Sequence, residues 1–219
     1  MTNTNIRCDF NNIIVHKPWG YEYLIYNNKD IAIWRLHISK GASTSLHSHP
    51  NKKTGLIILS GGAELNFLNN NAKKMFPLET VMLRQGVFHK TKAITSDVQL
   101  LEVENPNNKA DLIRLKDNYG REGTPYETRE HQTTDITLQK LVFGENYIDG
   151  NLLTMFNIQT LEDVNNTPYD IFMILEGFIS FKEFSVIGPG DVINRYNFLN
   201  MIEQFTLNPM LVVGICTTN

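Results

Sequence analysis

The residues best suited to chemistry in this sequence are three histidines, His47, His49 and His89. His47 and His49 are two positions apart, so on a β-strand both imidazoles project from the same face. His89 follows an apolar run at Thr80–Leu83, and a hairpin-type connection would bring it beside the first pair. Imidazole suits borderline divalent metals. The spacing therefore predicts one metal site built from the three histidines, for Zn, Fe, Mn or Ni.

The elements that would position these histidines are short strands. Runs rich in branched and aromatic residues are bounded by Gly, Pro and Asn, as strands are, and no long stretch shows a helical repeat of apolar residues. Many short strands at regular spacing indicate a sandwich or barrel, so an all-β fold is predicted. The expected strands are Tyr21–Tyr26, Ile31–Ile38, Leu56–Leu59, Ala63–Phe67, Thr80–Leu83, Val98–Val103, Leu152–Phe156, Ile171–Leu175 and Phe178–Phe181.

The sequence also contains an internal repeat. The stretch Leu56–Leu65 followed by Phe76–Val81 is similar to Phe172–Phe181 followed by Ile187–Val192. In each copy an apolar strand reaches a Gly-containing turn, a second strand follows, and a further turn opens a third strand. Repetition at this length indicates two copies of one β-unit.

Polar turn residues separate the two copies, and residues 120–135 have the composition of a linker. We therefore expect a metal-binding barrel at residues 10–120 and a second domain at residues 136–219. The second domain has no histidine, so we expect a degenerate unit without metal ligands that covers the first barrel or builds a dimer. Alignment of the copies sets Asp163, Asn165, Asp170 and Asn200 opposite His47, His49, Thr54 and His89.

The pattern Gly41-x5-His47-x-His49, followed by a strand to Gly61 and by Gly86-x2-His89, resembles the two metal motifs of the cupin superfamily. The resemblance implies a double-stranded β-helix, or jelly-roll barrel, in a bicupin-like arrangement of two tandem units. It also implies that the three histidines are metal ligands. A Glu usually stands seven residues before the Gly in that family, and here the position is Thr54. Glu102 or Glu104, which alternate on a late strand, could take its place.

Two flanking motifs narrow the resemblance. Lys17-Pro-Trp-Gly-Tyr-Glu22 and the stretch from Asp111 to Arg121, which ends Asp-Asn-Tyr-Gly-Arg, are similar to the ends of the mannose-6-phosphate isomerase cupin domain that is often fused to GDP-mannose pyrophosphorylase. This resemblance implies an aldose–ketose isomerase with Arg121 as a catalytic residue. Moving a carbonyl between neighbouring carbons requires a proton carrier, and a metal stabilises the charge that develops.

Cations near these motifs are candidates for holding the phosphate of such a sugar. We predict that Lys17, Lys90 and Lys92 bind the substrate. The chain departs from the isomerase pattern after His49, where Pro50, Asn51 and Thr54 replace the Arg and Glu of the family. That departure favours an alternative, a non-catalytic sugar-binding or regulatory cupin. Three histidines with an open coordination face would also suit an Fe(II)-dependent dioxygenase.

The bulk composition excludes several other classes. The chain of 219 residues has a net charge of −3, which gives no global attraction to nucleic acid or to an anionic membrane. No apolar run reaches membrane-spanning length, and the polar start does not resemble a signal peptide. We therefore expect a cytoplasmic protein with a small sugar derivative as its partner. Exposed sheet edges commonly pair, which predicts a homodimer.

Overall fold

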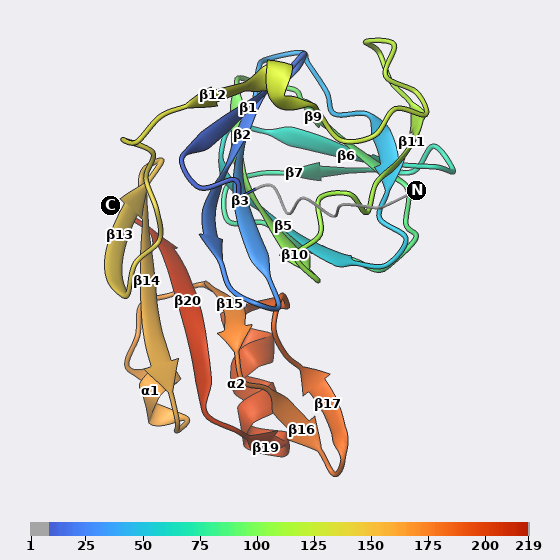
Figure 1. The fold of residues 1–219 in the computed structure, drawn as a ribbon. Coiled ribbons are helices and arrows are strands. Elements are labelled where there is room, and N and C mark those ends of the chain that lie inside the picture. Colours follow the sequence, from blue (N-terminus) through green and yellow to red (C-terminus); the bar gives the residue numbers. More distant parts are fainter. Residues whose placement is uncertain (1–8, 219) are drawn as a thin grey trace, which may run out of the picture.

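The computed structural model describes residues 9–218, which form four antiparallel sheets (Figure 1). The first half of the chain supplies two of them. The seven-stranded sheet has the order β12 (Gln132–Thr134), β1 (Ile13–Lys17), β2 (Gly20–Asn27), β3 (Ala32–Ile38), β10 (Val98–Asn105), β5 (Lys53–Ser60) and β8 (Thr80–Leu83). The five-stranded sheet beside it has the order β11 (Ile113–Lys116), β4 (Leu46–Ser48), β9 (His89–Ala93), β6 (Ala63–Phe67) and β7 (Ala72–Met75).

The chain passes back and forth between these two sheets. From β3 to β10 it visits the seven-stranded sheet with β3, β5, β8 and β10, and the other sheet with β4, β6, β7 and β9. This alternation defines a double-stranded β-helix, so the predicted all-β, cupin-type fold is confirmed. Apolar side chains from both sheets, among them Trp34, Leu65 and Leu100, form the core between them.

The second half repeats the strand order of the first. Its larger sheet has the order β13 (Gly144–Ile148), β14 (Asn151–Ile158), β20 (Met210–Thr217), β15 (Ile171–Glu176) and β18 (Val192–Asn194). Its smaller sheet has the order β17 (Phe184–Ile187), β16 (Ile179–Phe181) and β19 (Thr206–Leu207). Strands β14, β20, β15 and β18 hold the places of β3, β10, β5 and β8, in agreement with the repeat found in the sequence.

Two short helices interrupt this repetition. The segment α1 (Glu162–Asn165) stands where the first half has β4, and α2 (Arg195–Gln204) is inserted before β19. The expected correspondence of Asn200 with His89 is therefore wrong, because Asn200 lies in α2 and His89 lies in a strand. Asp163 and Asn165 likewise lie in α1 rather than on a strand that could present two side chains on one face. Helix α2 begins at Asn194, whose side chain accepts a hydrogen bond from the Asn197 amide.

A shared core joins the two halves. Ile33, Ile57 and Val103 on the outer face of the seven-stranded sheet pack against Met173 and Val213 of the second half. Polar contacts cross the same boundary: Arg35 donates twice to Asp149, Lys53 pairs with Asp191 at 2.7 Å, and Asn105 donates to the Pro189 carbonyl at 2.6 Å. The sheets thus form four stacked layers, with the second half covering the first.

The stretch expected to be a linker is partly structured. It contains a turn of 3₁₀ helix, η1 (Arg129–His131), and then β12, which pairs with β1. The domain boundaries, the homodimer and the cytoplasmic location stay predictions. Among the described residues, no helix has the length and hydropathy needed to cross a membrane. Cys8 lies outside the described residues, and Cys216 is a free thiol on β20.

Candidate metal centre and ligand pocket

The three predicted histidines meet inside the first half. His47 lies on β4 directly opposite His89 on β9, and His49 follows one residue after β4 ends. The ring centroids are 4.3 Å apart for His47 and His89, 4.9 Å for His47 and His49, and 5.6 Å for His49 and His89. One nitrogen from each ring lies within 4.8 Å of the other two. All three side chains are buried.

Backbone carbonyls orient all three rings in the same way. The Nδ1–H groups of His47, His49 and His89 donate to the carbonyls of Ser45 (2.8 Å), Asp111 (2.7 Å) and Val87 (3.1 Å). A carbonyl only accepts, so each Nδ1 carries the proton and each Nε2 keeps a free lone pair. Anchoring one ring nitrogen while the other binds a metal is the usual arrangement at histidine metal sites.

The electrostatic surroundings keep the three imidazoles neutral. Burial, reinforced by the neighbouring histidines, lowers the pKa of His47 well below its usual value. Burial and the nearby Lys52 lower the pKa of His49 to about 3, and burial lowers the pKa of His89 to about 4. Metal binding requires the neutral imidazole, so these residues are in the ligating form at neutral pH.

Two carboxyl groups lie beside the cluster, next to His49. Glu102 and Glu104 lie on β10 with their side chains on the barrel face, and ligand atoms of His49, Glu102 and Glu104 lie within 4.8 Å of one another. Glu104 is the cross-strand partner of Thr54, the position at which the cupin motif would have its Glu. A carboxylate is therefore present on the neighbouring strand, directly beside the position where the sequence lacks one.

The two carboxyl groups differ in protonation state because their ion pairs differ. Burial raises the pKa of Glu102, and the adjacent Glu104 raises it further against the pull of Lys109. Burial acts in the same direction on Glu104, but Lys109 and Lys52 outweigh it and lower the pKa of that group. Glu104 Oε1 accepts from Lys52 at 2.7 Å and from Lys109 at 3.2 Å. Glu104 is therefore the ionised member of the pair.

The donor set fits a divalent transition metal. His49 Nε2, Thr54 Oγ1 and Glu104 Oε2 are buried and have no hydrogen-bond partner among the described residues. Buried polar atoms are normally paired, and a metal or its bound water would satisfy such atoms. Three imidazole nitrogens with one carboxylate oxygen suit Zn, Fe, Mn or Ni better than Ca or Mg.

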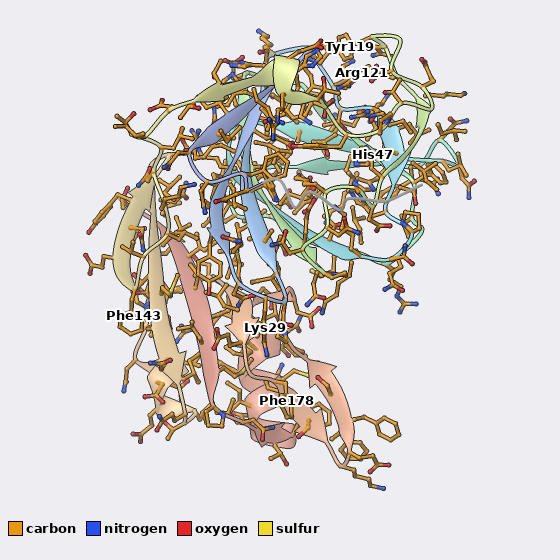
Figure 2. All side chains as sticks on the ribbon, in the orientation of Figure 1. Lys29, His47, Tyr119, Arg121, Phe143 and Phe178 are labelled. Atoms are coloured by element: carbon orange, nitrogen blue, oxygen red, sulfur yellow. The ribbon has the colours of Figure 1, made fainter. Side chains whose placement is uncertain are left out.

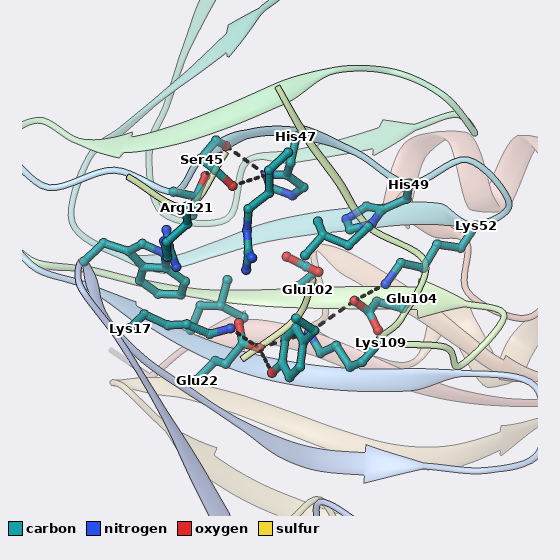
Figure 3. Close-up of a pocket in the computed structure, with 16 residues that line it drawn as sticks. Lys17, Glu22, Ser45, His47, His49, Lys52, Glu102, Glu104, Lys109 and Arg121 are labelled. Atoms are coloured by element: carbon teal, nitrogen blue, oxygen red, sulfur yellow. Dashed lines mark hydrogen bonds and ion pairs between the residues drawn. The ribbon is translucent and has the colours of Figure 1, made fainter. Parts of the chain in front are cut away.

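A pocket opens beside the histidines and is lined by charged side chains (Figure 3). Lys17, Arg121 and Arg114 line it together with His47 and His49. Its volume is about 50 Å³, which is room for a few water molecules. The other lining residues are Trp19, Glu22, Leu36, Thr44, Ser45, Lys52, Glu102, Glu104, Lys109, Leu112 and Tyr126.

Of the predicted phosphate-binding residues, the structure brings Lys17 and Arg121 to the pocket but not Lys90 or Lys92. Side chains alternate along β9, so Lys90 and Lys92 project to the opposite face from His89. Neither lysine lines the pocket, and their role in substrate binding stays a prediction. Lys17 lies 3.9 Å from the centroid of the Tyr126 ring and pairs with Glu22 at 3.4 Å.

Several pocket residues carried no clear signal in the sequence. The Lys109 side chain is 10% exposed and pairs with both Glu22 and Glu104 at 3.2 Å, and its ammonium lies 3.9 Å from the centroid of the Trp34 ring. Arg114 belongs to the motif that ends at Arg121, and that motif was the sequence feature that could have indicated its place in the pocket. Trp19 and Trp34 both pack in the core between the sheets, and Trp19 also lines the pocket.

Comparisons with known proteins cover about half of the chain. No family model matches it. The xanthan biosynthesis protein XanB from Xanthomonas campestris pv. campestris is 28% identical over 116 residues, which are 49% of this chain and 23% of XanB. The chain thus spans about a quarter of the length of this curated relative.

Several solved structures are similar at low identity. KdgF from Halomonas sp. covers 42% of this chain and 84% of its own, with a TM-score of 0.39 and 13% identity. The capsular polysaccharide assembling protein CapF from Staphylococcus aureus covers 48% of this chain and 34% of its own, with a TM-score of 0.42 and 17% identity. The fold assignment itself rests on the alternation of strands between sheets, which makes the first half a cupin-type double-stranded β-helix.

Proposed function

We propose that the protein is a metal-binding cupin that acts on a phosphorylated or nucleotide-linked sugar in the manner of a sugar-phosphate isomerase. One observation carries the proposal. A cluster of three neutral, backbone-anchored histidines contributes His47 and His49 to a pocket that Lys17, Arg114 and Arg121 also line. The histidines suit a metal, and Lys17, Arg114 and Arg121 suit an anionic group of the ligand.

Each group would have a distinct task in an aldose–ketose conversion. His47, His49 and His89 would hold the metal together with Glu104, and the bound metal supplies a Lewis acid that polarises the sugar carbonyl. Glu102 lines the same pocket and is not assigned to the metal, so we assign the transfer of the proton between neighbouring carbons to Glu102. The wall formed by Trp19 and Leu36 limits the access of water.

The curated relative supports a sugar derivative as the ligand, because XanB is described as a xanthan biosynthesis protein and xanthan is a polysaccharide. A second candidate function is a sugar-binding module without catalysis. It is favoured by the loop after His49, where Asn51 donates to the Asp111 carboxylate through both its amide groups. That loop is engaged in structural contacts and presents no Arg to a substrate.

Metal analysis and an exchange assay together test the proposal. Protein produced with metals supplied should contain about one divalent transition metal per chain. In D₂O with Mn²⁺, Fe²⁺ or Zn²⁺, an isomerase should transfer solvent deuterium to a carbon of mannose 6-phosphate or of a related sugar phosphate. Metal without exchange into any sugar phosphate would favour the sugar-binding module. Absence of stoichiometric metal would overturn the metal-dependent isomerase.

Two histidine variants distinguish loss of the metal site from general misfolding. Replacing His47 and His49 together with Ala should abolish metal binding, because it removes two of the three imidazole ligands. His37→Ala is the control, since His37 is hydrogen-bonded to Gln99 and stacked on Tyr21 outside the pocket. It should retain the metal. Loss of metal in His37→Ala to the same extent would show that the double variant acts through misfolding.

A further inference from the structure

A surface segment between β11 and β12 passes over the pocket and inserts a carboxylate among its cations. Glu127 Oε1 accepts from Arg114 at 2.8 Å and from Arg121 at 2.7 Å, and Oε2 accepts from Lys17. The side chain of Glu127 is 4% exposed, and those of Lys17 and Arg114 are 3% and 4% exposed. Three cations thus converge on a single buried carboxylate.

This arrangement has the geometry of an oxyanion site. Two guanidinium groups and one ammonium around an anion are typical of phosphate and carboxylate recognition in proteins. The cations also line the pocket that contains His47 and His49, whereas Glu127 is not among the lining residues. A ligand that reached the histidines would therefore meet the same three cations that Glu127 now engages.

The space beside the cations is small. The pocket has a volume of about 50 Å³, which is room for a few water molecules, so a larger ligand requires side chains around it to move. Tyr126, next to Glu127, lines the pocket and donates from its hydroxyl to Glu22. Residues 122–131 therefore bound one side of the pocket through Tyr126, while Glu127 engages the cations.

We propose that Glu127 occupies an oxyanion subsite formed by Lys17, Arg114 and Arg121, and that the phosphate of the ligand takes its place when the segment opens. The sugar part of this inference rests on the proposed function. The subsite itself requires only an anion with phosphate chemistry.

Other contacts would keep the cations in position after Glu127 leaves. Arg121 donates twice to Asp117, at 3.0 and 2.8 Å. Lys17 keeps its pairing with Glu22 at 3.4 Å. Lys17 and Arg121 would thus stay in position. Arg114 also donates to Thr124 and to the Pro125 carbonyl in the moving segment, so the bound phosphate would replace those contacts. Without the carboxylate the subsite gains net positive charge, which favours binding of a dianion.

Inorganic phosphate is the probe, measured by calorimetry on the full-length chain without added metal. Glu127→Gln should bind phosphate at least about tenfold more tightly than the wild type, because a closed state reduces the apparent affinity by the open fraction. Glu130→Gln, an exposed acid on the same segment, is the matched control and should bind as the wild type does. Equal or weaker binding by folded Glu127→Gln would overturn the proposal.

Hydrogen exchange on the wild type gives a second, independent test that does not depend on a variant folding. Saturating phosphate should accelerate amide exchange across residues 122–131, since the segment loses its anchor. Slower or unchanged exchange with phosphate bound would overturn the proposal, as would the absence of phosphate binding at up to about 100 mM. Neither measurement involves a metal or turnover, so failure here is distinguishable from failure of the proposed isomerase.

Discussion

The two halves of the molecule share a strand order but differ in what fills them. Between the sheets of the first half lie ionised groups, including Glu22, Lys52 and Glu104, all buried. Between the sheets of the second half lie apolar side chains, with Phe172 and Phe198 fully buried and their ring centroids 4.9 Å apart. Figure 2 shows His47 and Arg121 in the first half and Phe143 and Phe178 on the second.

The difference arises from two local changes. In the first half β4 and β9 place His47 directly opposite His89 as cross-strand partners, and each buried charge has a partner. In the second half α1 replaces the equivalent of β4, and α2 directs Phe198 and Ile202 into the interior. A double-stranded β-helix therefore accommodates either a charged pocket or an apolar core. The buried charges of the first half are tolerated because they are paired with opposite charges.

The largest effect is expected when the two halves of the chain are separated. A chain ending at Asp135 retains β12 but exposes Ile33, Ile57 and Val103, which the second half now covers. Such a large exposed apolar patch favours aggregation, so we expect loss of soluble, monodisperse protein. Size-exclusion chromatography and thermal unfolding measure this. A monodisperse fragment as heat-stable as the full chain would show that the second half has no structural role.

Acid should unfold the charged half before the apolar half. Burial favours the neutral form of Glu22, but Lys109 and Lys17 hold its pKa at about 2, below the ordinary value of 4.5. The stabilisation from Glu22 is therefore complete above pH 4.5 and is lost as the pH falls towards 2. Trp19 and Trp34 both lie in the first half, so their fluorescence should change over this range while helix α2 still contributes to circular dichroism.

Glu22→Gln tests the same point at neutral pH. Removing one partner of a buried ion network costs about 3–5 kcal/mol, which denaturant unfolding at pH 7 would detect, and the remaining acid transition should be shallower. Glu203→Gln, an exposed acid on α2, should change neither quantity. An equal effect of the two substitutions would contradict the role given to the buried network.

The sequence was sufficient to predict the features that depend on local pattern. Runs of branched and aromatic residues bounded by Gly, Pro and Asn predicted the strands. The His-x-His spacing with His89 predicted the cluster, because two-residue periodicity determines which face a side chain occupies. The same rule, applied to β9, places Lys90 and Lys92 on the face opposite His89. The internal repeat predicted the shared strand order, although a single-residue alignment could not anticipate the insertion of α2.

Features that depend on the tertiary pairing of strands and loops could not be predicted from the sequence. Glu104 stands opposite Thr54 only through the register of β10 with β5, and no local pattern encodes that register. Glu127 lies far along the chain from Lys17, and a surface loop brings them together. Lys109 has no motif, since its position in the pocket depends on the two glutamates that it contacts.

Packing between the halves can be tested at a single position on β5. A Cβ added at Gly55 would lie 2.6 Å from Val192 Cγ2 and 3.1 Å from Met82 Sδ. Gly55→Ala should therefore cost about 1–3 kcal/mol through overpacking, measured by urea unfolding. Adding Val192→Ala removes the clash, so the double variant should be more stable than the sum of the single effects predicts. Strict additivity would show that β5 and β18 are not in contact.

The smallest expected effect concerns Thr54, the residue at the position where the cupin motif has a Glu. Its hydroxyl is buried and has no partner among the described residues, and an unpaired buried hydroxyl carries a desolvation cost. Thr54→Val, which is nearly isosteric, should therefore raise the free energy of unfolding by up to about 1 kcal/mol. Thr44→Val is the matched control, a second buried threonine of the first half, because the Thr44 hydroxyl accepts from the Thr91 amide at 3.0 Å and donates to the Ser45 carbonyl. It should lower the free energy of unfolding by about 1 kcal/mol. If Thr54→Val is destabilising to the same degree, the Thr54 hydroxyl has a hydrogen-bond partner in solution. Glu104 would then not be the only member of this cross-strand pair that directs a partnered oxygen towards the histidines.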